Sequence, residues 1–208
     1  MPTPISSQDG ESDQAFKQDD LLRVRLADVD DAGQIALLHA DSWRRYYRGA
    51  YSDSFLDGDV VADRRSVWST RLADPTRSRT VVAEDGGRLI GFVHVMFDHD
   101  PQWGSLVDNL HVTYDQHRTG VGTALLAHAA RAAVAHATTH GLYLWVLEQN
   151  TAAQRFYQAC GACHVETATV SPPGADPSRL NGSPRKFRMA WPDATGPSQL
   201  DTACASTP

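Results

Sequence analysis

Two glycines in the segment 110–126 give the clearest chemical signal in this chain. The segment predicts a β-strand, then a turn that contains Gly120 and Gly122, then an amphipathic helix. Glycine lets backbone N–H groups approach a ligand closely, and a helix start offers unpaired N–H donors at the positive end of its dipole. These are the ingredients of a pyrophosphate cradle. A purely steric role for the glycines in a strand-to-helix turn is the alternative.

The elements expected before this turn are one strand, then two helices, then three strands. Asp28 is placed to cap the first helix, and Asp85-Gly86-Gly87 is a strong hairpin signal. The expected elements are a strand over 22–26, a helix to about 46, a helix over about 60–72, strands over 79–84 and 88–97, a polar loop at 99–104 and a strand over 105–112.

After the turn, helices and strands alternate, and two strands end the domain. We expect a helix from 121 to about 139, a strand over 142–147, a short helix over 151–159, and strands near 164–170 and 185–191. A run of antiparallel strands followed by a β-α-β-α-β half predicts an α/β (α+β) fold. Its sheet is mixed and mostly antiparallel, with helices on both faces.

Composition favours one domain over residues 21–192. The chain has 208 residues, of which 41% are hydrophobic, enough for one substantial core. Residues 1–20 are rich in Ser, Gln and Asp, and residues 193–208 in Pro, Gly, Ser and Thr, so both tails are predicted to be disordered.

Net charge and the distribution of apolar residues argue against some classes of function. A net charge of −6 argues against nonspecific nucleic-acid binding and is compatible with a cationic acceptor. No apolar run approaches the roughly 20 residues that span a bilayer, and the N-terminus lacks the apolar region of a signal peptide. Three cysteines do not make a disulfide framework. A cytoplasmic protein without a membrane partner is therefore expected.

Two motifs resemble the GNAT acetyltransferase superfamily. His117-Arg118-Thr119-Gly120-Val121-Gly122 resembles its acetyl-CoA pyrophosphate loop, usually Gln/Arg-x-x-Gly-x-Gly/Ala. Residues 144–161 resemble the second signature, a strand, an Asn, and a helix that carries Phe-Tyr and ends at a Gly. Residues 24–28 and 35–39 resemble the usual first strand and helix. The resemblance covers about residues 22–191 and is specific at superfamily level only.

The resemblance implies a sheet with a splayed strand pair at the cofactor site, and an enzyme. Its reaction is transfer of an acetyl group from acetyl-CoA to a primary amine by direct attack, without an acyl-enzyme intermediate or a metal. The acceptor could be polyamine-like, an aminoglycoside, an amino acid, or a peptide or protein amine. Dimers are common in the superfamily, so a homodimer is compatible. The alternatives are a non-catalytic acyl-CoA sensor and, last, a nucleotide-binding regulator.

The resemblance also assigns cofactor contacts. The backbone of the strand end pairs with the pantetheine amides, and a splay after His111 leaves those groups free. The loop donates N–H groups to the pyrophosphate. Asn150 either caps the following helix or contacts the pantetheine arm or the amine. The full set is Leu110, His111, Val112, His117, Arg118, Thr119, Gly120, Val121, Gly122, Thr123 and Asn150.

The sequence supports a candidate for the general acid more clearly than a candidate for the general base. Tyr157 is the implied general acid beside the thioester sulfur, and a half-buried packing role is its alternative. Some members place a Glu base where this chain has Leu106. Asp108 lies on the same strand face by period-2 geometry and is our candidate base, although it could equally fix a backbone group or an Arg. His111 is the other candidate.

Other signals carry less weight. Cys160 and Cys163 have Cys-x-x-Cys spacing but no redox context, so packing is favoured over metal or redox chemistry. For each of several aromatic and basic residues in the segment 43–55, helix-end packing is favoured over acceptor binding. His94, Asp98, His99 and Asp100 suit a solvated turn better than a metal site, and His128, His136 and His140 are expected on the surface.

Overall fold

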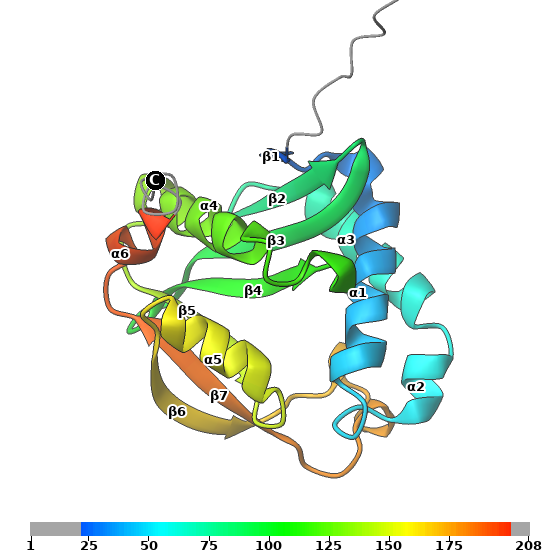
Figure 1. Cartoon of the computed structure of the whole chain (residues 1–208). Helices are drawn as coiled ribbons and strands as arrows, with labels where there is room; N and C mark the ends of the chain where they lie inside the picture. The colour runs from blue at the N-terminus through cyan, green and yellow to red at the C-terminus, as the bar shows by residue number, and fades with distance from the viewer. Residues whose placement is uncertain (1–21, 201–208) are drawn as a thin grey trace, which may run out of the picture.

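One seven-stranded sheet organises the molecule, which we describe for residues 22–200 of a computed structural model (Figure 1). The strand order is β1-β2-β3-β4-β5-β7-β6, and only the β4–β5 pair is parallel. The predicted mixed, mostly antiparallel sheet is confirmed. The strands are β1 (Arg23–Leu26), β2 (Ser78–Asp85), β3 (Arg88–Asp100), β4 (Gly104–Val112), β5 (Leu142–Leu147), β6 (Cys163–Thr169) and β7 (Arg185–Trp191).

Helices cover both faces of the sheet. On one face, Ile35 and Trp68 from the first and third helices pack against Phe92 of β3. On the other, Leu125 and Tyr157 from the fourth and fifth helices join the main core. The helices are α1 (Ala32–Tyr46), α2 (Asp53–Asp57), α3 (Val60–Ala73), α4 (Val121–His136), α5 (Thr151–Ala159) and α6 (Thr195–Ser198).

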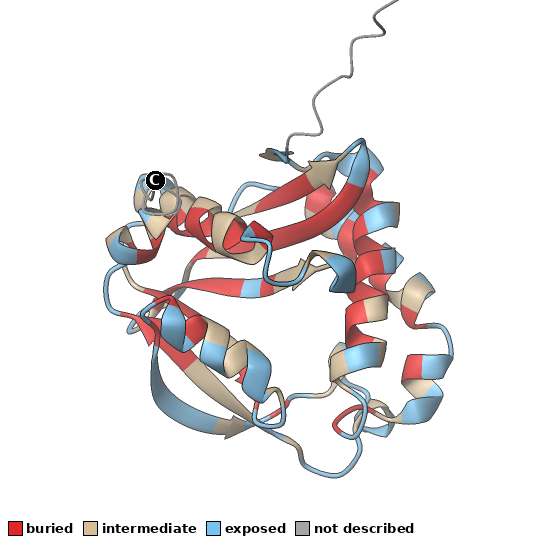
Figure 2. Ribbon diagram, viewed as in Figure 1, coloured by how far each residue is buried: buried red, intermediate tan, exposed pale blue. Residues whose placement is uncertain are grey.

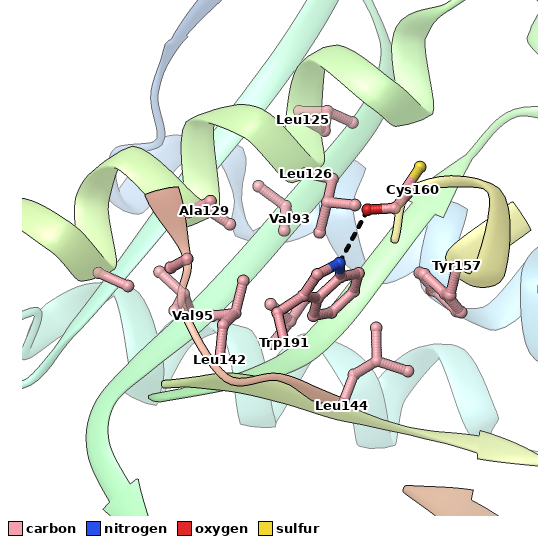
Figure 3. Close-up of a cluster of buried hydrophobic side chains, with 14 of the residues drawn as sticks. Val93, Val95, Leu125, Leu126, Ala129, Leu142, Leu144, Tyr157, Cys160 and Trp191 are labelled. Atoms are coloured by element: carbon pink, nitrogen blue, oxygen red, sulfur yellow. Dashed lines mark hydrogen bonds between the residues drawn. The ribbon is translucent and has the colours of Figure 1, made fainter. Parts of the chain in front are cut away.

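The main core lies between the sheet and the pair α4 and α5. Buried residues form continuous stripes along the central strands and the inner side of α4 (Figure 2). Trp191 lies in this core, and its indole Nε1 donates a 2.8 Å hydrogen bond to the carbonyl oxygen of Cys160, at the end of α5 (Figure 3). This bond fixes α5 against the last strand.

A split between β4 and β5 is the feature that matters most for function. The two strands pair only at Ser105 with Leu142 and at Leu106 with Tyr143. Beyond these pairs, β4 continues beside β3 and β5 continues beside β7. We expected the splay after His111; it begins five residues earlier. The backbone edges of 107–112 and 144–147 are therefore not paired with each other.

A β-bulge in β4 sets which side chains face the split. His94 of β3 pairs with Asn109, but the next residue, Val95, pairs with Val107. Asp108 is thus the extra residue, which shifts the side-chain alternation by one position. The bulge leaves Asp108 on the α3 side and brings His111 to that side as well.

Three element boundaries differ from expectation. α4 ends at His136 rather than near 139, because the carboxylate of Asp98 accepts hydrogen bonds from the N–H groups of Thr138 and Thr139. β3 extends to Asp100, whose carboxylate accepts from the N–H groups of the next turn. The expected loop at 99–104 is therefore only a three-residue turn.

Two short helices, α2 and α6, lacked a periodic signal in the sequence. α6 lies within the segment 193–208, which composition predicts to be disordered. Ala194 and Pro197 are buried there, and Ser198 accepts a hydrogen bond from Arg131 of α4. The predicted disorder of residues 1–20 and of residues 201–208 concerns residues that lie outside the described range. Between 22 and 200, no helix combines the length and apolar character needed to cross a bilayer.

Candidate functional site

The start of α4 presents a set of backbone donors. Gly120 precedes the helix with a φ of +94°, and the first intrahelical bond runs from the N–H of Ala124 to its carbonyl oxygen. The N–H groups of Val121, Gly122 and Thr123 therefore have no intrahelical acceptor. A Cβ on Gly120 would meet no atom within 4 Å, so the turn is open beside Gly120. A pyrophosphate fits this arrangement.

The loop before α4 is held by its own side chains. The Nε2 of His117 lies 3.2 Å from the carbonyl oxygen of Val112, and its ring stacks on Tyr46 at 6.0 Å. Thr119 donates a 2.8 Å hydrogen bond to the carbonyl of Gln116. Arg118 is exposed, with a left-handed φ of +66°. His117 thus fixes the loop to the end of β4.

The free edge of β4 lies beside this loop. Leu110, His111 and Val112 pair with β3 on one side and are half-buried. Their other edge faces the split, where β5 has moved away. An extended ligand with amide groups could pair with this edge as an added strand does.

The turn after β5 ties the two sides of the split together. Asn150 Oδ1 accepts a 3.2 Å hydrogen bond from the N–H of Ala153, so its predicted capping role is confirmed. Gln149 Nε2 donates to the carbonyl oxygens of Tyr46 and Arg48, at 3.1 and 2.9 Å. Sequence patterns do not predict the contacts of Gln149, because they join residues about a hundred positions apart.

Tyr157 is buried on α5, at the border of the main core. Its ring packs edge-on to Trp191 at 6.3 Å and against Phe156 at 5.1 Å. Burial, and then the neighbouring hydroxyl of Tyr47 and Cys160, raise the pKa of Tyr157 above its ordinary value. The phenol is therefore protonated at neutral pH. Because Tyr47 comes from the end of α1, the two phenols approach the split from different elements.

Asp108 has polar partners on its own strand and on α3. Its Oδ2 lies 2.7 Å from Arg71 and accepts a 2.6 Å hydrogen bond from Asn109. Its Oδ1 has no partner in the part of the chain that the structure describes. The Arg-fixing role considered as the alternative for Asp108 is thus present, yet one oxygen stays available to a ligand.

His111 lies in a buried aromatic cluster. Its ring is 4.7 Å from that of His39 and 5.3 Å from Phe92. Burial lowers the pKa of His111 to about 4, although the charge of Asp108 acts in the opposite direction. Trp68 donates a 3.0 Å hydrogen bond to His39 Nδ1, which leaves the other nitrogen of His39 buried without a partner among the described residues. Both imidazoles are neutral at pH 7.

The aromatic segment between α1 and α3 mainly packs. Trp43 and Tyr51 are buried beside Leu147 of β5, which confirms the expected packing role for these two residues. Tyr46 faces the loop before α4, as its stacking on His117 shows. Burial, and then the charge of Asp108, raise the pKa of Tyr47 to about 12.

The remaining residues considered in the sequence have structural partners. Leu106 is buried against Tyr143 and Ala190, so it contributes no polar group. Cys160 is buried and Cys163 exposed, and both are free thiols. His94 was expected in a solvated turn, but it is buried within β3, 2.8 Å from Thr80. At the β3–β4 turn, His99 lies 2.6 Å from Tyr143 and Asp100 pairs with Arg188. Within 22–200 no three His, Cys, Asp or Glu side chains gather as metal ligands.

Sequence patterns did not predict two cationic residues near Asp108. Arg71 lies on α3 and Lys186 on β7, far from both motifs in sequence. Lys186 is close enough for the charge of Asp108 to act on its pKa. No spacing rule links residues 71, 108 and 186, so only the sheet order brings them together.

Comparisons with known proteins agree with this geometry. A model of the acetyltransferase (GNAT) family matches residues 40–162. Uncharacterized N-acetyltransferase YuaI of Bacillus subtilis (strain 168) is 28% identical over 176 residues, which cover 83% of this chain and 94% of that protein. Rv2775 of Mycobacterium tuberculosis, described as a probable N-acetyltransferase, is 28% identical over 143 residues, covering 66% and 77%.

A solved structure shares the fold. The PaiA N-acetyltransferase from Thermoplasma acidophilum, in complex with coenzyme A, superposes with a TM-score of 0.64 over 82% of this chain and 99% of that one. At 15% identity this likeness concerns the fold alone.

Proposed function

The chain belongs to the GNAT acetyltransferase family, and on that premise we propose that it moves an acetyl group from acetyl-CoA to a primary amine by direct attack. The observation that carries the proposal is the split between β4 and β5, which ends at the unpaired N–H groups of α4. A thioester on an extended amide-bearing arm, with a pyrophosphate behind it, would use both the unpaired strand edge and these donors.

The chain's own groups suit acetyl-CoA binding. The N–H groups of Val121, Gly122 and Thr123 would hold the pyrophosphate, with Arg118 adding positive charge at the rim. The free edge of 110–112 would pair with the pantetheine amides. His117 and Thr119 would act by fixing the loop, since both already bind backbone carbonyls.

The transfer step needs an amine without its extra proton. The amine nitrogen forms a bond to the thioester carbonyl carbon, the carbon–sulfur bond then breaks, and the sulfur leaves with the electron pair. In our proposal the phenol of Tyr157 gives its proton to that sulfur, and burial favours the protonated phenol needed for this role.

Asp108 is the proposed acceptor of the amine proton, through its free Oδ1. His111 is the second candidate, because it is uncharged at neutral pH and lies on the same side of β4. Its burial makes the imidazolium costly, so we favour the carboxylate, acting directly or through a water molecule.

Calorimetry with acetyl-CoA, followed by detection of free CoA thiol over a panel of amines, tests this proposal. Binding together with amine-dependent thiol release is the expected result. Binding without release from any amine would favour the acyl-CoA sensor, for which the apolar Leu106 is the specific argument. Absence of acetyl-CoA binding would refute the cradle and the proposed function together.

A further inference from the structure

A strip of cations and aromatic rings runs along β5 and β7 on one side of the split. Lys186 pairs with Leu147, and Arg188 with Trp145, so these side chains share a face of the sheet. Leu147 packs against Trp43, which identifies that face as the α1 side. The Trp145 ring has Lys186 Nζ 4.5 Å and Arg188 Cζ 4.6 Å from its centroid.

The two cations of the strip differ in their partners. Arg188 forms ion pairs with Asp100 at 3.0 Å and Glu166 at 2.8 Å. Lys186 is half-buried and has no ion pair or hydrogen bond with any residue of the described segment. Burial, and then the charge of Arg188, lower the pKa of Lys186, while Asp108 and Glu166 oppose this from beyond contact distance. A carboxylate placed beside Lys186 would supply the partner that the protein does not.

Lysine is rare in this chain, which makes its position informative. The sequence contains 17 arginines and two lysines, Lys17 and Lys186. Lys17 lies outside the described residues. An ammonium is a compact, strongly hydrated cation, and leaving one half-buried without a partner is costly.

Lys186 and Asp108 lie on the same face of the sheet, on opposite sides of the split. Asp108 of β4 contacts Arg71 of α3, and Lys186 of β7 shares its face with Leu147, which packs against Trp43 of α1. The charge of Asp108 also acts on the pKa of Lys186. Among the described residues, Asp108 Oδ1 accepts no hydrogen bond and the Lys186 ammonium has no ion pair. This face of the split therefore offers one acceptor of protons and one partner for an anion.

We propose that the acceptor is an amine that also carries a carboxylate, as an amino acid does. Its amino group lies toward Asp108 Oδ1 and its carboxylate binds the ammonium of Lys186. Trp145 fixes the lysine side chain, and Arg188 is excluded from this role because two carboxylates already occupy it. This assignment of the substrate class rests on the proposed acetyl transfer.

Matched acceptor pairs test the assignment by kinetics. The pairs are L-phenylalanine with phenethylamine, L-lysine with cadaverine, and β-alanine with ethylamine. The carboxylate-bearing members are expected to have kcat/KM values higher by about tenfold or more. Lys186→Met should remove this preference by raising KM for those members only. Arg185→Met removes a cation from the neighbouring exposed position on β7 and should keep the preference.

A binding measurement makes the test independent of turnover. Reductive methylation with ¹³C-formaldehyde labels only Lys17, Lys186 and the N-terminal amine, so Lys186 is assigned by comparison with Lys186→Met. A saturable shift of the Lys186 signal with L-phenylalanine, L-lysine or β-alanine in the presence of CoA, but not with their decarboxylated partners, is expected. As a control, the labelled protein should still bind acetyl-CoA.

Three results would overturn the assignment. They are a preference for the decarboxylated amines, a Lys186 signal that no carboxylate moves, and acetylation of Lys186 itself, seen by mass spectrometry. If thiol release occurs with decarboxylated amines alone, the proposed acetyl transfer stands and only the substrate class fails. If no amine releases thiol, acetyl transfer fails, and the Lys186 signal still decides whether a carboxylate binds there.

Discussion

The carboxylate of Asp108 on β4 lies 2.7 Å from the guanidinium of Arg71 on α3. The pair uses one carboxylate oxygen, Oδ2, which also accepts a hydrogen bond from Asn109, while Oδ1 accepts none from the described residues. Both side chains of the ion pair are 30% exposed, which places the pair at the border between core and solvent. An arginine here orients the carboxylate.

Asp108→Asn should reduce turnover by about a hundredfold, because a positioned proton acceptor contributes on that scale. Steady-state kinetics with an accepted amine measure this change. Arg71→Gln keeps the carboxylate but removes the guanidinium that holds it, so turnover should fall less than in Asp108→Asn. Wild-type turnover in Asp108→Asn would transfer the role to His111 or water.

Tyr157→Phe should lower kcat by about tenfold to a hundredfold and leave the Kd of acetyl-CoA nearly unchanged. The ring that packs against Trp191 and Phe156 is retained, so the thermal midpoint should stay close to that of the wild type. Thiol release and calorimetry separate the two effects. Wild-type turnover in this variant would remove Tyr157 as the acid.

Gly120→Val should abolish measurable acetyl-CoA binding, because the proposed cradle needs the pyrophosphate to approach the backbone of this turn and a branched side chain would block that approach. Gly87→Val is the matched control. Gly87 has a φ of +79° and open space around its Cβ, but it lies in the β2–β3 hairpin. Each variant should lose about 1–2 kcal/mol of stability from the left-handed backbone. Equal acetyl-CoA affinities in the two variants would contradict the cradle.

Asp98→Ala should lower the free energy of unfolding by about 1 kcal/mol, since the N–H groups of Thr138 and Thr139 lose their acceptor. These backbone hydrogen bonds hold the pKa of Asp98 below its ordinary value of 3.8. Because the folded pKa is depressed, the contribution is complete above pH 3.8 and is lost as the pH falls through the folded value.

Urea titrations of Asp98→Ala across the acidic range test this pH dependence of stability. The stability gap between the wild type and the variant should narrow as the pH falls. Asp98→Asn is the control that keeps an oxygen acceptor and tolerates the φ of +48°, and it should show a smaller gap at neutral pH. A gap that widens in acid would exclude this role for Asp98.

Local patterns in the sequence predicted most of the elements. The strand over 142–147 and the helix over 151–159 match β5 and α5 because a short apolar run and the Asn150 cap are local signals. The Gly86-Gly87 turn and the glycines before α4 were predictable for the same reason. α2 and α6 were not, because helices of five and four residues carry no periodic pattern and are held by their surroundings.

The sequence by itself thus indicated the family, and it predicted a cradle at Gly120 and Tyr157 as the leading candidate acid, because each depends on residues close together in the chain. Only the tertiary structure decided that the split begins after Leu106 and that Asp108 meets Arg71. It also decided that Lys186 has no ion pair with any described residue and lies on the same face of the sheet as that carboxylate. Strand order and a one-residue bulge set these relationships, and neither leaves a periodic trace in the sequence.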